Sequence, residues 1–165
     1  MTTQRLDASS APGAPEEQRT ITFTDPVSLR SPSGGPSGLF LDVSHLFVTL
    51  PVGRRWQAST RLYEYRLIDR DQTELLVYHW QPGPAFQGSD HPHLHVSAAL
   101  HAQIDALNEQ MIDLDKLHIS TGRVSLEAVV RMLITEFKVA PVRPDWRQTL
   151  DRTEAVFREE ATRRK

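Results

Sequence analysis

The stretch RLYEYRLIDRDQTELLVYHW, residues 61–80, decides the fold that the sequence predicts. Residues 61–68 and 74–80 are rich in aromatic and aliphatic side chains, and the polar residues 69–72 between them are typical of a turn. Two such segments around a short polar connection predict a β-hairpin. The returning strand is apolar on both faces, as expected of a strand at the centre of a sheet. We therefore expect an antiparallel sheet centred on this hairpin.

The segments on either side of the hairpin predict the rest of the fold. Residues 39–50 form a strongly apolar segment whose alternation changes phase near His45, which indicates a bulge or two short strands. Apolar residues at three- and four-residue steps predict amphipathic helices. We expect helices over residues 100–111, over 125–138 with Ser125 as its N-cap, and from Asp145 onward. The predicted fold class is α+β, with the helices packed on one face of the sheet.

The N-terminal segment differs from the rest of the chain. Residues 1–19 carry almost no large apolar side chains, so little can be buried there to offset the entropy lost on ordering. We expect residues 1–19 to be a disordered tail and residues 20–165 to form a single α+β domain.

The composition excludes several classes of function. The chain of 165 residues has 39% hydrophobic residues and a formal net charge of -2, so no overall basic field favours nucleic acid. It has no cysteine, which leaves histidine and carboxylates as the only strong metal ligands. The sequence offers no apolar run of membrane-spanning length and no signal-peptide core. We expect a cytoplasmic protein without a membrane partner.

The stretch HPHLHV, residues 91–96, predicts where a functional site lies, because it holds three of the seven histidines. Residues two apart on a strand point to the same face, so His93 and His95 should project together. His79, on the hairpin, follows the same alternation as its neighbours Leu75 and Val77 and can reach the same site. Three histidines with an open position suit a divalent metal such as zinc. Without a metal, the same histidines can act as catalytic acids and bases.

A metal-free alternative rests on a repeated pattern. LHVS at residues 94–97 and LHIS at residues 117–120 both read apolar, His, apolar, Ser. This pair resembles the signature of the two-histidine phosphoesterases. The resemblance implies that His95 and His118 each act as acid or base while the hydroxyl groups bind phosphate.

A second resemblance covers about residues 60–136. The order is an aromatic hairpin, a polar turn, an aromatic strand, a Pro-His-x-His element and a helix that opens on Ser-Leu-Glu. This order is similar to the TumE toxins of type II toxin–antitoxin pairs. The matching positions are Tyr63, Tyr65, His79, Pro92, His93 and His95. The resemblance implies attack on RNA and a helix-turn-helix antitoxin as the cognate partner.

Further residues are candidates for binding a phosphodiester substrate. Arg123 follows Gly122 and precedes a predicted helix N-terminus, where backbone amides favour an anion, so it could hold a phosphate. Tyr78 and Trp80 could stack on bases, and His118 could join the site. The leading hypothesis is a toxin-like ribonuclease that uses His79, His93 and His95. The alternative is a non-enzymatic interaction module in which the histidines are structural or hold a metal.

Overall fold

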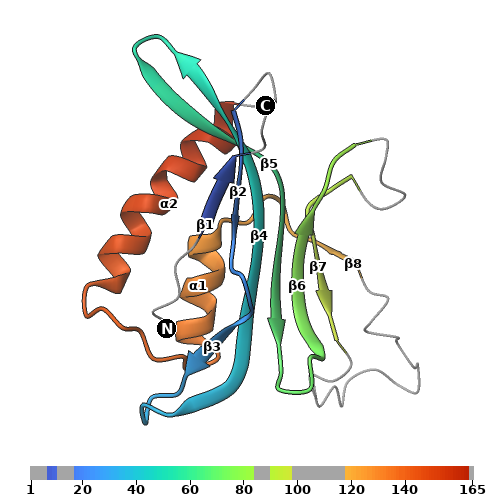
Figure 1. The fold of residues 1–165 in the computed structure, drawn as a ribbon, viewed down its shortest axis with the longest axis vertical. Helices are drawn as coiled ribbons and strands as arrows, with labels where there is room; N and C mark the ends of the chain where they lie inside the picture. The colour runs from blue at the N-terminus through green and yellow to red at the C-terminus, as the bar shows by residue number, and fades with distance from the viewer. Residues whose placement is uncertain (1–6, 11–16, 84–89, 98–117, 164–165) are drawn as a thin grey trace.

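A computed structural model describes residues 7–10, 17–83, 90–97 and 118–163 (Figure 1). Within these residues the chain forms one eight-stranded sheet whose pairings are all antiparallel, together with two helices. The α+β prediction is therefore confirmed. The predicted helix over residues 100–111 lies outside the described residues.

The sheet runs in the order β1-β2-β4-β5-β6-β7-β8, with β3 paired to β4 beside this path. The strands are β1 (Asp7–Ser10), β2 (Glu17–Thr22), β3 (Val27–Arg30), β4 (Pro36–Val52), β5 (Arg55–Ile68), β6 (Glu74–Trp80), β7 (His93–Val96) and β8 (His118–Ser120). The β5–β6 hairpin lies inside this order, between β4 and β7, as the apolar character of both faces of β6 predicted.

A short turn holds the hairpin in register. The Asp69 carboxylate accepts the backbone N–H groups of Asp71 and Thr73, at 2.8 and 2.9 Å. An aspartate that binds the backbone two residues ahead is a common turn-forming device. The register then shifts by one residue between Ile68 and Leu67, and beyond this shift Glu64 lies opposite His79.

The change of phase near His45 corresponds to a bulge. Strand β4 is continuous, but its pairing with β5 shifts after Leu46, which pairs with Leu62, while Phe47 pairs with Thr60. One extra residue on β5, Arg61, thus stands between two consecutive pairs. The extra residue changes the alternation of β5, so that Thr60 lines the same cavity as His45 and Phe47, whereas β4 keeps its own alternation past the bulge.

The prediction of an N-terminal disordered tail differs from the structure at residues 7–10 and 17–19. Strand β1 pairs with β2, and β2 pairs with β4 from Glu17 to Thr22. Backbone hydrogen bonds to an existing sheet edge hold these polar segments, and a composition argument based on apolar burial does not detect such pairing.

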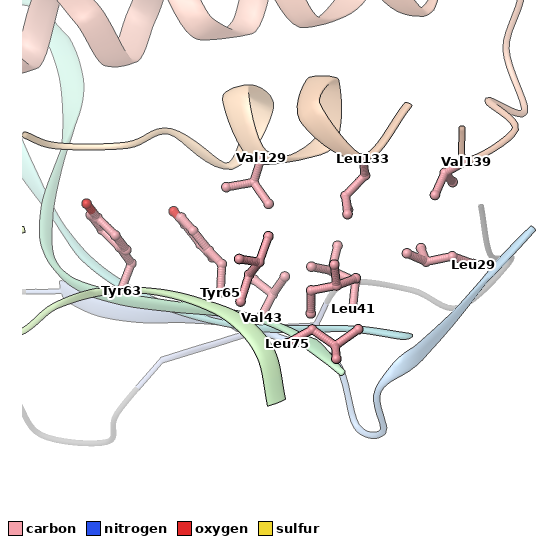
Figure 2. Packing of buried hydrophobic residues seen from close by; sticks show 11 residues of the cluster. Leu29, Leu41, Val43, Tyr63, Tyr65, Leu75, Val129, Leu133 and Val139 are labelled. Atoms are coloured by element: carbon pink, nitrogen blue, oxygen red, sulfur yellow. The ribbon is translucent and has the colours of Figure 1, made fainter. Parts of the chain in front are cut away.

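Helix α1 (Leu126–Thr135) covers one face of the sheet, and α2 (Trp146–Arg163) packs beyond it. Figure 2 shows Val129 and Leu133 of α1 pointing towards Tyr63, Tyr65 and neighbouring apolar side chains of the sheet. Arg131 of α1 pairs with Asp151 and Glu154 of α2, at 2.7 and 3.3 Å. Neither described helix combines the length and apolar character needed to cross a lipid bilayer.

The N-cap of α1 yields a testable prediction. Ser125 is 2% exposed, and its hydroxyl oxygen accepts the backbone N–H of Ala128 at 3.0 Å. Ser125→Ala leaves that N–H without its partner, so we expect the free energy of unfolding to fall by about 1 to 2 kcal/mol in urea titrations. Ser28→Ala, at an exposed position of β3, is the matched control. It should change the free energy of unfolding by less than about 0.5 kcal/mol. Equal effects of the two substitutions would show that the cap contributes nothing.

Candidate metal centre on the sheet

Neighbouring strands β6 and β7 bring three histidines to one face of the sheet. His79 of β6 pairs with His93 of β7, and His95 lies two residues further along β7. On β6, the Tyr78 hydroxyl donates to Met132 Sδ of α1 at 3.4 Å, so Tyr78 faces the helices. Adjacent strand residues point to opposite faces, which places His79 on the face away from α1. We call this the far face.

The three imidazole rings lie close together. One ligand nitrogen from each of His79, His93 and His95 can be chosen so that all three lie within 4.8 Å of one another. The ring centroids are 5.3 Å apart for His79 and His93 and 4.7 Å apart for His93 and His95. Nitrogens at this spacing can bind one ion after small rotations of the side chains, because zinc–nitrogen bonds are about 2.0–2.1 Å long. The structure thus brings together the three predicted metal ligands.

A hydrogen bond orients the buried member of the cluster. His93 is only 4% exposed, and its Nδ1 lies 2.7 Å from the backbone oxygen of His91. A carbonyl oxygen only accepts, so Nδ1 carries the proton and Nε2 keeps the lone pair of the neutral ring. Metal-binding histidines commonly have their second nitrogen held in this way. His79 is held similarly, through its Nε2 donating to Gln81 Oε1 at 3.3 Å.

A carboxylate that the sequence analysis missed lies beside the histidines. A surface hollow of about 320 Å³ is lined by His79 and His95 together with Glu64 and Glu74. Glu64 is the cross-strand neighbour of His79, so the two side chains share the far face. Counting outward from the hairpin turn would place Glu64 opposite Tyr78, and only the register shift between Leu67 and Ile68 places it opposite His79, so the sequence alone did not give this pairing. The site therefore combines three imidazoles with a nearby carboxylate.

His118 is placed by the backbone alone. Strand β8 pairs with β7 so that His118 lies opposite His95 and Ser120 opposite His93. The two segments that share the apolar-His-apolar-Ser pattern are thus antiparallel neighbours in the sheet. The side chain of His118 is outside the described part of the structure.

Arg123 does not join the histidine cluster, contrary to the phosphate-binding prediction. It lies on the helix side of the sheet, where its guanidinium stacks 4.5 Å from the centre of the Trp80 ring. Its Nη2 pairs with Glu160 of α2 at 2.9 Å, and the two side chains are 15% and 7% exposed. The guanidinium also lies 5.4 Å from the centre of the Phe157 ring, so its charge is directed at Glu160 and two aromatic rings and does not face the histidine cluster.

Tyr78 and Trp80, predicted to stack on bases, also lie on the opposite face of the sheet from the histidine cluster. Both residues alternate with His79 along β6, so they point away from the far face. Both pack against the hydrophobic core on the helix side. Their aromatic rings contribute to the core, which is the commoner role for aromatic residues at strand spacing.

On the helix side, His45 forms a second polar site that the sequence analysis did not predict. Its Nδ1 lies 2.9 Å from the Tyr65 hydroxyl and its Nε2 lies 3.1 Å from the Thr60 hydroxyl. Burial, with a smaller contribution from the charge of Arg123, lowers the pKa of His45 from 6.5 to about 4. His45 is therefore neutral in the folded protein at physiological pH.

This shift predicts a pH dependence of stability. Between pH 6.5 and pH 4 the unfolded chain binds a proton at His45 that the folded protein does not, so stability falls as the pH falls through this window. We expect the free energy of unfolding to drop by about 2 kcal/mol more for the wild type than for His45→Gln between pH 7 and pH 5. Urea unfolding of both proteins at the two pH values measures the difference. Identical pH dependence in both would contradict the assignment.

Comparison of the chain with protein-family models, with curated proteins and with solved structures finds no match in any of the three. The functional interpretation therefore depends on the site itself. Its defining features are three histidines on one sheet face and a carboxylate in the adjoining hollow.

Proposed function

We propose that this protein is a metal-dependent phosphodiesterase that acts on RNA. The observation that carries the proposal is the His79–His93–His95 cluster, whose candidate ligand atoms lie within 4.8 Å of one another. Three protein ligands with one position left open are typical of catalytic zinc sites, whereas structural zinc sites generally use four. Imidazole ligands favour zinc and neighbouring transition metals over magnesium or calcium.

The residues around the cluster fit hydrolysis. When bound, zinc lowers the pKa of a coordinated water and so supplies a hydroxide near neutral pH. Glu64, across from His79, is in position to accept a proton from a water in the hollow. The hydrogen bond from His93 to the backbone of His91 keeps the ring in the tautomer that a metal requires.

The charge of the hollow makes the metal important for binding as well as for chemistry. Glu64 and Glu74 line it, and Arg66 beside them is paired with Asp42, Glu64 and Glu74. A phosphodiester anion brought to these carboxylates is repelled unless a bound cation offsets their charge. RNA binding at this site should therefore depend on the metal.

The resemblance to the TumE toxins supports RNA as the substrate. Under this proposal the protein is the toxin of a bacterial toxin–antitoxin pair, acts in the cytoplasm and is neutralised by a helix-turn-helix antitoxin. Expression in bacteria should arrest growth, and His93→Ala combined with His95→Ala should abolish the arrest. Growth arrest that persists in a folded double variant would exclude the histidines as the toxic site.

The direct test is cleavage of a fluorescent RNA by protein purified without a histidine tag. We expect activity with zinc or manganese, loss of activity after metal removal, and recovery when the metal is returned. Glu64→Gln should lower kcat by roughly 10²- to 10⁴-fold, as for the loss of a general base, while zinc affinity stays near that of the wild type.

Glu74→Gln is the matched control for this substitution, because Glu74 lines the same hollow but does not face His79. It should leave kcat within a few-fold of the wild-type value. Zinc binding without cleavage of RNA under any condition would instead support the non-enzymatic module with a structural metal.

A second candidate function is metal-free cleavage by two histidines. The register that places His95 opposite His118 favours it, because two histidines on adjacent strands can act as an acid–base pair. RNA cleavage that resists a strong chelator and is lost in His118→Ala would support this candidate over the metal-dependent one.

A further inference from the structure

A second cavity lies on the opposite side of the sheet from the histidine cluster. It has a volume of about 230 Å³, opens to the surface, and is lined by residues of β2, β4 and β5 of the sheet, the start of α1, and α2. Ile21, Phe47 and Phe157 contribute to its largely apolar wall, and Val156, which is 67% exposed, lies at its rim. An apolar protein cavity of about 150 Å³ can hold benzene, so this space can take a substituted single ring.

Tyr65, His45 and Thr60 form a chain of side-chain hydrogen bonds that ends at this cavity. The donor and the acceptor of each bond can be assigned. Tyr65 is 1% exposed and burial raises the pKa of its hydroxyl, so the hydroxyl is protonated and needs an acceptor. The acceptor that it contacts is Nδ1 of His45, at 2.9 Å. The neutral His45 ring then carries its proton on Nε2, which donates to the Thr60 oxygen at 3.1 Å.

The Thr60 hydroxyl is therefore left with a hydrogen to donate. Thr60 is 6% exposed and lines the cavity together with His45. Among the described residues, the Thr60 hydroxyl makes one side-chain hydrogen bond, to His45. In that bond the Thr60 oxygen is the acceptor. A buried hydroxyl donor usually finds a partner, and the cavity is where a ligand could supply one. The ligand should therefore carry a hydrogen-bond acceptor.

The charges at the cavity restrict the ligand further. Glu127 and Glu160 both line it, and Glu160 is neutralised by its ion pair with Arg123. The remaining carboxylate of Glu127 disfavours an anion in this partly buried space. We propose that the cavity between the sheet and α2 binds a small, neutral aromatic molecule whose carbonyl oxygen accepts a hydrogen bond from Thr60. This site is independent of the histidine cluster and of the proposed phosphodiesterase activity.

Titration of the full-length protein with acetophenone, followed by saturation-transfer NMR, tests this site. Isopropylbenzene has nearly the same shape but no acceptor, so it serves as the matched ligand. Thr60→Val should weaken acetophenone binding roughly three- to tenfold, the loss expected for one hydrogen bond, without weakening isopropylbenzene binding. Thr162→Val, at an exposed position of α2 that does not line the cavity, should leave both affinities unchanged.

A surface substitution keeps the test valid if Thr60→Val disturbs folding. Val156→Trp places a large side chain at the exposed rim and should weaken binding of both ligands in a protein with a native circular dichroism spectrum. The absence of saturable acetophenone binding to the wild type would overturn the proposal. Equal weakening of both ligands by Thr60→Val would overturn the role of the hydroxyl donor.

Discussion

Replacing His93 with alanine is expected to lower the zinc affinity of the protein at least about 100-fold. His93 stands between the other two ligands, pairing with His79 across the strands and preceding His95 by two residues on β7. Loss of residues that merely orient metal ligands costs about 10- to 100-fold in affinity, so loss of a ligand should cost at least the upper end of this range. Competition with a chromophoric zinc chelator measures the affinity.

His91→Ala is the matched control for this substitution. His91 belongs to the same histidine-rich stretch but lies outside the three-histidine cluster, and its backbone oxygen accepts the hydrogen bond from His93. Alanine keeps that backbone oxygen, so His91→Ala should bind zinc nearly as well as the wild type. Equal losses in the two variants would mean that the stretch binds zinc nonspecifically.

Replacing Arg123 with methionine is expected to destabilise the protein by about 3 kcal/mol. The substitution keeps much of the side-chain volume but removes the positive charge that pairs with Glu160, whose side chain is 7% exposed. A buried carboxylate without its partner is costly, and the stacking of the guanidinium on Trp80 is lost as well. Urea unfolding at neutral pH measures the change in the free energy of unfolding.

Two further variants separate the ion pair from general effects of losing an arginine. Arg158→Met removes an arginine of α2 whose side chain is 74% exposed, and it should cost no more than about 0.5 kcal/mol. Adding Glu160→Met to Arg123→Met removes the unpaired carboxylate and should restore most of the lost stability. If Arg123→Met is as stable as the wild type, the pair has no structural importance and the phosphate-binding interpretation of Arg123 regains support.

The hairpin and the histidine face could be predicted because both depend on local alternation. The polar turn between two aromatic strands identified β5 and β6, and the two-residue spacing of His93 and His95 placed both on one face. The same alternation puts His79 and Tyr78 on opposite faces, so assigning both to one site was inconsistent with the predicted strand.

The partners of Arg123 could not be predicted, because they depend on long-range packing. A short loop that precedes a helix N-terminus is compatible with anion binding, and nothing nearby in the sequence shows that Glu160 of α2 will occupy that position. Strand β1 and the first residues of β2, which had been predicted to be disordered, were missed for a different reason. Their pairing with β4 uses backbone groups, which every sequence carries.

The most direct test of the three-histidine metal site is zinc titration of tag-free, metal-depleted protein, followed by the imidazole nitrogen resonances of its histidines. The proposal predicts one zinc ion per chain, with the resonances of His79, His93 and His95 shifting together. The resonances of His45, whose nitrogens contact Tyr65 and Thr60, should stay in place. Zinc binding that leaves the resonances of His79 and His93 unchanged, or no binding at millimolar zinc, would contradict the metal site.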